Sequence, residues 1–139
     1  MFVKIKLTIG NTPQIEGYQN VELLYGKWRI EGLPKHSQSH ILVIDALDHV
    51  EYNDRQKLLT ELTELLRKDC EIVVGGIDVR EVIRQVYLRQ LTVEQFNNVV
   101  HQVKSFGSLR ETVEIIKSLG LTVKTSKFEG ARYEITAGR

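Results

Sequence analysis

Two short runs of consecutive apolar residues constrain the fold of this chain more than any other feature. They cover residues 41–44 and 72–74, and a leucine-rich stretch with helical spacing lies between them. Strands that are apolar without alternation are typical of parallel sheets whose two faces are both covered. The pattern therefore predicts two buried strands, joined by a helix, that lie parallel and adjacent at the centre of a sheet.

The flanking sequence extends this plan with further strands and helices. The other expected strands are residues 2–9, 20–25, 121–128 and 132–137, and the expected helices are residues 53–67, 79–89, 92–101 and 108–119. The side chains expected to cap three of these helices are Asn53, Thr92 and Ser108. We therefore predict an α/β fold: a three-layer sandwich with a mostly parallel sheet and an antiparallel C-terminal strand, in a single domain that covers residues 1–139.

The connection between the first two strands is short. Residues 11–19 are fewer than the roughly twelve residues that a helical crossover between parallel strands needs. We therefore expect the first connecting helix to be vestigial or missing, which would leave one face of the sheet thinly covered near the first two strands. Exposed apolar surface of this kind favours self-association, so we expect a homodimer.

Composition limits the partners and the chemistry of the chain. Nineteen basic and eighteen acidic residues give a net charge of +1, and no basic run is long enough to neutralise several phosphates, which argues against duplex nucleic acid as a partner. Cys70 is the only cysteine, which excludes a disulfide, and the four histidines lack the spacing of a metal site. The N-terminus lacks the apolar core of a signal peptide. These features predict a cytoplasmic protein without a metal or a membrane anchor.

Two places on this frame carry chemical signals. Ligands of parallel sheets bind beyond the carboxyl ends of the strands, where Gly10 would allow close approach and Glu22 could accept hydrogen bonds from a ribose. Asp45, Asp48 and His49 follow the central strand, and an imidazole can accept a proton near neutral pH. Structural alternatives stay open: a simple turn at Gly10, a solvated strand carboxylate at Glu22, and capping or loop contacts by Asp48 and His49.

The order of motifs along the chain follows that of a known family. The matching segments are residues 6–11, 16–22, 30–34, 44–50, 77–78, 96–97 and 133–135. The first four correspond to a hydrophobic strand with a Gly-rich turn, a Gly-Tyr-x-Asn motif followed by Val or Ile and an acid, a Leu-Pro loop, and a Leu-Glu-His motif that ends the fourth strand. Over nearly its whole length the sequence resembles the small class I S-adenosylmethionine-dependent methyltransferases.

The resemblance implies a Rossmann-like fold with S-adenosylmethionine as the cofactor. The residues that it assigns to cofactor binding are Gly10, Asn11, Glu22, Glu31 and Leu33, and those that it assigns to catalysis are Asp45, Asp48 and His49. His49 is the candidate base for the methyl acceptor. The acceptor would be a small molecule or a glycan precursor.

Four positions depart from the family's pattern. Thr12 stands in place of a second glycine, Arg29 in place of an acid before the Leu-Pro loop, and His40 in place of an acid that opens the fourth strand. Residues 67–70 replace a Lys-Pro-Gly-Gly turn. The sheet tolerates such changes better than a cofactor site does. Two alternatives therefore stay open: a working methyltransferase, and a catalytically inactive methyltransferase-like protein with a binding or assembly role.

Overall fold

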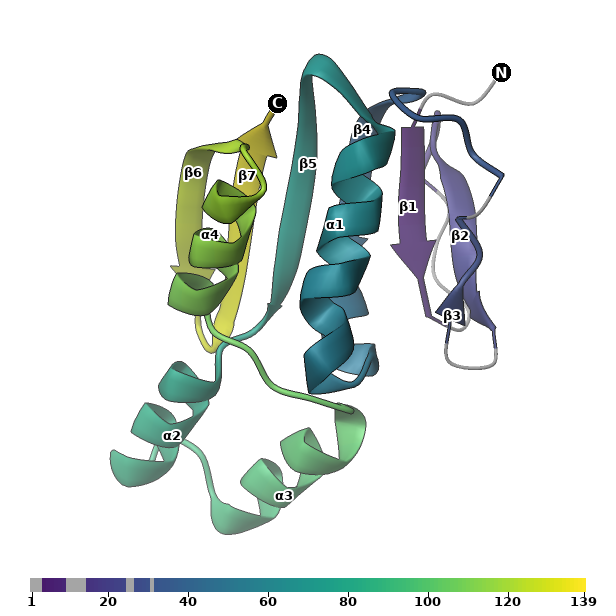
Figure 1. Cartoon of the computed structure of the whole chain (residues 1–139). Coiled ribbons are helices and arrows are strands. Elements are labelled where there is room, and N and C mark those ends of the chain that lie inside the picture. Colours follow the sequence, from purple (N-terminus) through teal and green to yellow (C-terminus); the bar gives the residue numbers. More distant parts are fainter. Residues whose placement is uncertain (1–3, 10–14, 25–26, 31) are drawn as a thin grey trace.

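A mixed sheet forms the centre of the molecule (Figure 1). The structure is a computed structural model that describes residues 4–9, 15–24, 27–30 and 32–139. The strands in these residues are β1 (Lys4–Thr8), β2 (Gln19–Leu24), β3 (Lys27–Trp28), β4 (Gln38–Ile44), β5 (Leu66–Ile77), β6 (Thr122–Glu129) and β7 (Arg132–Gly138). Their order in the sheet is β3-β2-β1-β4-β5-β7-β6. β2, β1, β4 and β5 run parallel, whereas β7 is antiparallel to both of its neighbours.

The helices begin close to where the sequence predicts them. They are the 3-10 helices η1 (Ala46–His49) and η2 (Tyr52–Asp54) and the α-helices α1 (Arg55–Leu65), α2 (Val79–Tyr87), α3 (Val93–Gln102) and α4 (Leu109–Ser118). The hydroxyls of Thr92 and Ser108 accept backbone hydrogen bonds at the starts of α3 and α4, as predicted. The predicted cap at Asn53 is wrong, because this residue lies within η2 and α1 follows that turn directly.

The two central strands are placed as the sequence predicts. β4 and β5 are adjacent and parallel, with Ile41 beside Ile72 and Val43 beside Val74. All four side chains are fully buried beneath α1 and α4, in the core that also holds the leucines of α1. The Rossmann-like order and the mostly parallel sheet are confirmed.

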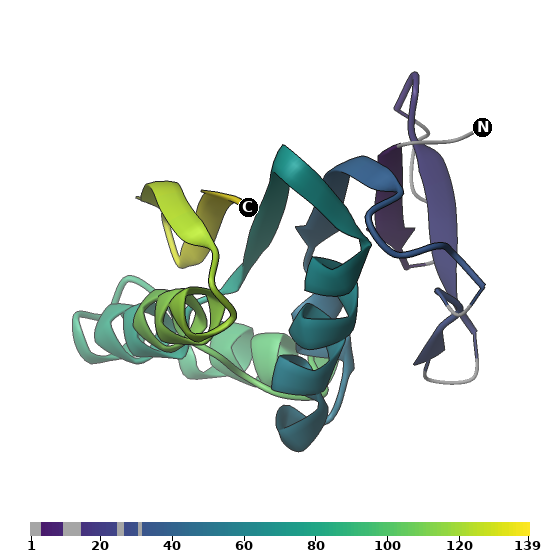
Figure 2. The same ribbon diagram turned by 45° about the horizontal axis from the view of Figure 1, so that its top comes forward.

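The opposite face of the central strands is not buried to the same degree. Leu42, Ile44 and Val73 alternate with the core residues and are only half-buried, so the prediction that these strands are buried on both faces is wrong. The reason is visible in Figure 2, where α1 and α4 both lie on one face of the sheet. None of the described helices covers the other face, which we call the open face, so the third layer of the predicted sandwich is not formed by the described residues.

Helices α2 and α3 project beyond the carboxyl edge of the parallel strands (Figure 1). We call residues 79–102 the α2–α3 arm. Val82 is its only buried residue, and α3 has none. The arm carries five of the nine exposed large apolar side chains among the described residues: Ile83, Tyr87, Leu88, Val93 and Val100. Neither these helices nor the others in the described residues are long and apolar enough to cross a membrane.

Candidate functional site

A pocket of about 360 Å³ lies at the carboxyl ends of β1 and β4. We call it the site pocket, and its lining residues are Lys6, Leu7, Thr8, Ile9, Ile15, Leu42, Ile44, Asp45 and His49. Several of these side chains come from the open face. Ligands of parallel α/β sheets bind at this edge, and the volume is within the range of small-molecule pockets. Two of the three predicted catalytic residues, Asp45 and His49, therefore lie in one pocket wall.

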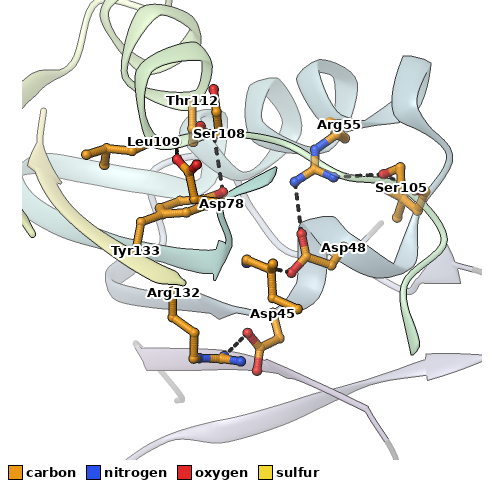
Figure 3. Close-up of polar contacts among 12 residues, drawn as sticks. Asp45, Asp48, Arg55, Asp78, Ser105, Ser108, Leu109, Thr112, Arg132 and Tyr133 are labelled. Carbon is orange, nitrogen blue, oxygen red and sulfur yellow. Dashed lines mark hydrogen bonds and ion pairs between the residues drawn. The ribbon is translucent and has the colours of Figure 1, made fainter. Parts of the chain in front are cut away.

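The turn from β4 into η1 brings Asp45 to the rim of the pocket. Asp45 has a left-handed backbone (φ 65°), which aspartate tolerates better than most residues, and its N–H donates to the Gly75 carbonyl over 2.9 Å. Its carboxylate forms a partly exposed ion pair with Arg132 of β7 (Figure 3). The rim of the pocket thus holds a carboxylate that is paired with one arginine.

His49 ends the same 3-10 turn and lines the pocket with a half-buried ring. The residues that cap η1 are Asp45 and Val50, so His49 does not act as its cap. No hydrogen bond to its ring comes from the described residues. This arrangement leaves the imidazole nitrogens available to a molecule in the pocket.

Asp48 does not join its two neighbours at the pocket. Its side chain is buried, with one oxygen accepting from Arg55 at 3.1 Å and the other from the Ile77 N–H at 3.0 Å (Figure 3). Burial raises the pKa of the Asp48 carboxyl, although the Ile77 hydrogen bond and the charge of Arg55 act in the opposite direction. Asp48 is thus held in the protein interior, and both of its carboxylate oxygens have protein partners.

Arg55 extends this interior contact into a network beneath η1. Its guanidinium donates to the Ser105 hydroxyl at 2.7 Å, and that hydroxyl donates to the Val50 carbonyl at 2.7 Å (Figure 3). A side chain at Gly107 would have its Cβ 2.6 Å from the guanidinium, so the loop approaches closely only because this residue is glycine. The network fixes η1, and with it Asp45, against α1 and the loop before α4.

The sequence interpretation missed Arg55, although a signal was present. Arg55 occupies a position on the apolar stripe of α1, three and four residues before Leu58 and Leu59. A charged residue on the buried face of a helix requires a partner of opposite charge.

Asp78 was also missed as a structural residue. Its carboxylate accepts hydrogen bonds from the Glu81 N–H at 3.0 Å and from the Leu109 N–H at 2.7 Å, which joins the starts of α2 and α4 (Figure 3).

The predicted cofactor residues are only partly described. Gly10, Asn11 and Glu31 lie outside the described residues. Glu22 is exposed on β2, and the strand register places it beside Thr8, which lines the site pocket. Leu33 is half-buried and packs against the core, and it is not a lining residue of the pocket. Of the two predicted cofactor residues that the structure describes, Glu22 is the one that the register pairs with a residue of the pocket wall.

Comparison with known proteins identifies the fold. No protein-family model matches the sequence, and no curated protein matches it. Among solved structures, a SAM-dependent methyltransferase from Archaeoglobus fulgidus is similar over 99% of this chain and 88% of its own, with a TM-score of 0.66 and 12% identity. A possible histamine N-methyltransferase from Thermotoga maritima has a TM-score of 0.61 and 17% identity, over 88% of this chain and 64% of its own.

A third similar structure contains ligands. It is the 1,6-didemethyltoxoflavin-N1-methyltransferase of Burkholderia thailandensis, which was solved with bound 1,6-didemethyltoxoflavin and S-adenosylhomocysteine. Its TM-score is 0.54 at 14% identity, and the match covers 89% of this chain but 52% of that enzyme. The chain described here has the fold of the class I SAM-dependent methyltransferases, in a form that spans only part of the larger ones.

Proposed function

We propose that this chain is a single methyltransferase-like domain that binds S-adenosylmethionine in the site pocket and directs its methyl group to a small molecule or a glycan precursor. The observation that carries the proposal is the position of the pocket at the carboxyl ends of β1 and β4, with Asp45 and His49 in its wall. We also propose a cytoplasmic location, because a chain whose single cysteine is Cys70 suits a reducing compartment.

The chemistry of the pocket fits this cofactor. Apolar side chains from both strands and from Ile15 form one part of the wall, which suits an adenine ring and the methylene groups of the methionine chain. Asp45 in the pocket wall would attract a cationic sulfonium, and Glu22, which is paired with the lining residue Thr8, would accept hydrogen bonds from a ribose. When bound, the cofactor would supply an activated methyl group.

The residues of the chain would then orient the acceptor and receive its proton. We assign proton acceptance to His49, because its ring lines the pocket and has no hydrogen bond from the described residues. Asp45 would hold a polar group of the cofactor or the acceptor at the rim. Asp48 is a positioning residue in this proposal, since its carboxylate is bound by Arg55 and Ile77 beneath the turn that carries the other two.

The second candidate function is a non-catalytic binding or assembly role on the same fold. Two observations favour it. The described residues between β1 and β2 contain no helix, and the open face lacks a helical layer in the part of the chain that the structure describes. In addition, Thr12 and Arg29 replace the family's glycine and acid. Either change would weaken the cofactor contacts without unfolding the sheet.

Calorimetric titration of the folded protein with S-adenosylmethionine and S-adenosylhomocysteine separates the two candidates. We expect measurable binding that Glu22→Ala weakens by about tenfold or more, because the carboxylate would lose charge-assisted hydrogen bonds to the ribose. Glu61→Ala is the matched control, because Glu61 is also an exposed glutamate but lies on α1. This variant should bind the cofactor like the wild type. Absence of heat at saturating cofactor would remove the enzymatic proposal and favour the non-catalytic one.

A further inference from the structure

A second cavity of the described structure lies away from the site pocket. It is a groove of about 850 Å³ between α2, α4 and the end of β6, and it shares no lining residue with the site pocket. Its lining residues are Asp78, Arg80, Glu81, Ile83, Arg84, Tyr87, Leu109, Arg110, Val113, Glu114, Lys117 and Phe128. We call it the arm groove, because α2 of the α2–α3 arm forms one of its walls.

An apolar ridge runs along the same wall. Ile83 and Tyr87 are one helical turn apart on α2, and their exposed fractions are 57% and 84%. Phe128 of β6 adds a further exposed ring across the groove. Single exposed apolar residues are ordinary, but three that line the same groove mark an interaction surface. The arm has little burial of its own that would explain these residues.

The charges around the groove indicate what kind of partner fits it. Four basic and three acidic side chains line it, and two pairs of opposite sign lie on its two helices, Arg84 with Glu81 on α2 and Arg110 with Glu114 on α4. A surface with nearly balanced charge does not select a strongly acidic or strongly basic partner. In a two-fold contact between two copies of this surface, the basic side chains of one copy can instead pair with the acidic side chains of the other.

We propose that the arm groove and the ridge beside it form a two-fold interface with a second copy of this chain, so that α2 of each copy lies in the groove of the other. A two-fold contact requires one surface to carry both complementary shapes, and here the ridge and the groove are adjacent on α2. The proposal places self-association at the arm rather than near β1 and β2, where Ile15 and Leu24 are the exposed large apolar residues among those described.

Sedimentation equilibrium of the full chain tests this proposal. The wild type should be a dimer at high micromolar concentration, and Tyr87→Asp should weaken its association by about tenfold or more, because two charges would be brought together at the interface. Leu24→Asp, at a side chain that is 43% exposed on β2, is the matched control and should leave the dimer intact. A monomeric wild type, or equal association of the wild type and Tyr87→Asp, would overturn the proposal.

Hydrogen exchange locates the interface independently of the variants. Amides of residues 79–88 and 109–117 should gain protection as the wild-type concentration rises, and they should not do so in Tyr87→Asp. Because Tyr87 is exposed, the variant should keep the wild-type circular dichroism and melting temperature under conditions where both are monomers. Protection that appears instead in residues 19–24 would place the interface at the β2 edge and contradict the proposal.

Discussion

Asp45 and Asp48 lie on the same short turn, yet their surroundings differ completely. Asp45 is at the rim of the site pocket in a partly exposed pair with Arg132, whereas Asp48 is buried in a pair with Arg55. Exposed pairs contribute little to stability, while removal of one partner from a buried pair leaves an uncompensated charge in the interior. The comparison indicates that the two acids of this turn have different roles. Asp48 fixes the backbone from the interior, and Asp45 stays available to a ligand at the rim.

The most severe test of this division is Asp48→Ala. The substitution leaves the Arg55 guanidinium buried without its carboxylate, and we expect a loss of about 3–5 kcal/mol in the free energy of unfolding measured with urea. Asp45→Asn, which keeps a side chain that tolerates the left-handed backbone, is the control on the same turn and should cost about 1 kcal/mol or less. Equal costs for the two variants would show that the interior network does not fix the turn.

The two faces of the sheet extend the same comparison. Leu62 of α1 is fully buried on the helical face, and Leu62→Ala should cost about 2–5 kcal/mol through lost burial and a cavity. Leu42 of β4 lies half-buried on the open face, so Leu42→Ala should cost less than half as much. Urea denaturation of both variants measures the difference. A cost at Leu42 as large as that at Leu62 would mean that the open face is covered in solution.

Local sequence patterns were sufficient for most elements of this fold. The caps at Thr92 and Ser108 depend only on a hydroxyl and the helix that follows, so they could be predicted without knowledge of the rest of the chain. The parallel central pair follows from two apolar runs with a helix between them. Each cap, each apolar run and the helix between the runs is a local pattern of a few neighbouring residues.

The features that the sequence did not predict depend on distant parts of the chain. Burial of Leu42 and Val73 depends on whether a second helical layer exists, and apolar runs do not contain that information. The inward orientation of the Asp48 side chain depends on Arg55 of α1 and Ile77 of β5, to which its carboxylate is bound. Strand β5 begins at Leu66, well before the apolar run at 72–74, because Leu66 already pairs with Gln38 of β4. Pairing with β7 begins only at Glu71.

A smaller effect is expected at Tyr133, whose hydroxyl lies 3.2 Å from that of Thr112 in the core (Figure 3). Burial raises the pKa of Tyr133 above the ordinary tyrosine value, so the folded state holds the phenolic proton more tightly than the unfolded state does. This contribution is complete below about pH 10 and is lost as the pH rises through the folded pKa. Tyr133→Phe removes the hydrogen bond with Thr112 and should cost about 1 kcal/mol in the free energy of unfolding at neutral pH.

The cost of Tyr133→Phe should shrink as the pH rises above about 10, because only the wild type must then bury or release a phenolate. Denaturant unfolding at a series of pH values, with absorbance of the tyrosinate followed in parallel, measures both quantities. Tyr18→Phe, at a tyrosine outside both this core contact and the arm groove, provides the control for unspecific alkaline effects. A pH-independent difference between the wild type and Tyr133→Phe would contradict the assigned direction of the pKa shift.

The smallest expected effect concerns Arg132, the partner of Asp45 at the rim. Because both side chains are partly exposed, Arg132→Met should change the free energy of unfolding by no more than about 1 kcal/mol. It should nevertheless alter ligand preference. Without the arginine, the Asp45 carboxylate adds its full negative charge to the site pocket, which favours the cationic sulfonium of S-adenosylmethionine over the neutral sulfur of S-adenosylhomocysteine.

The ratio of the two affinities, measured by calorimetry, should rise by less than about tenfold in Arg132→Met, and the gain should decrease at high salt because exposed charges are screened. Lys124→Met removes a lysine from an exposed pair with Glu71 in the middle of β5, and neither residue lines the pocket, so this variant should leave the ratio unchanged. If both variants keep the wild-type ratio, Asp45 does not face the bound ligand, and the rim of the site must then be sought among the residues around Thr8 and Glu22.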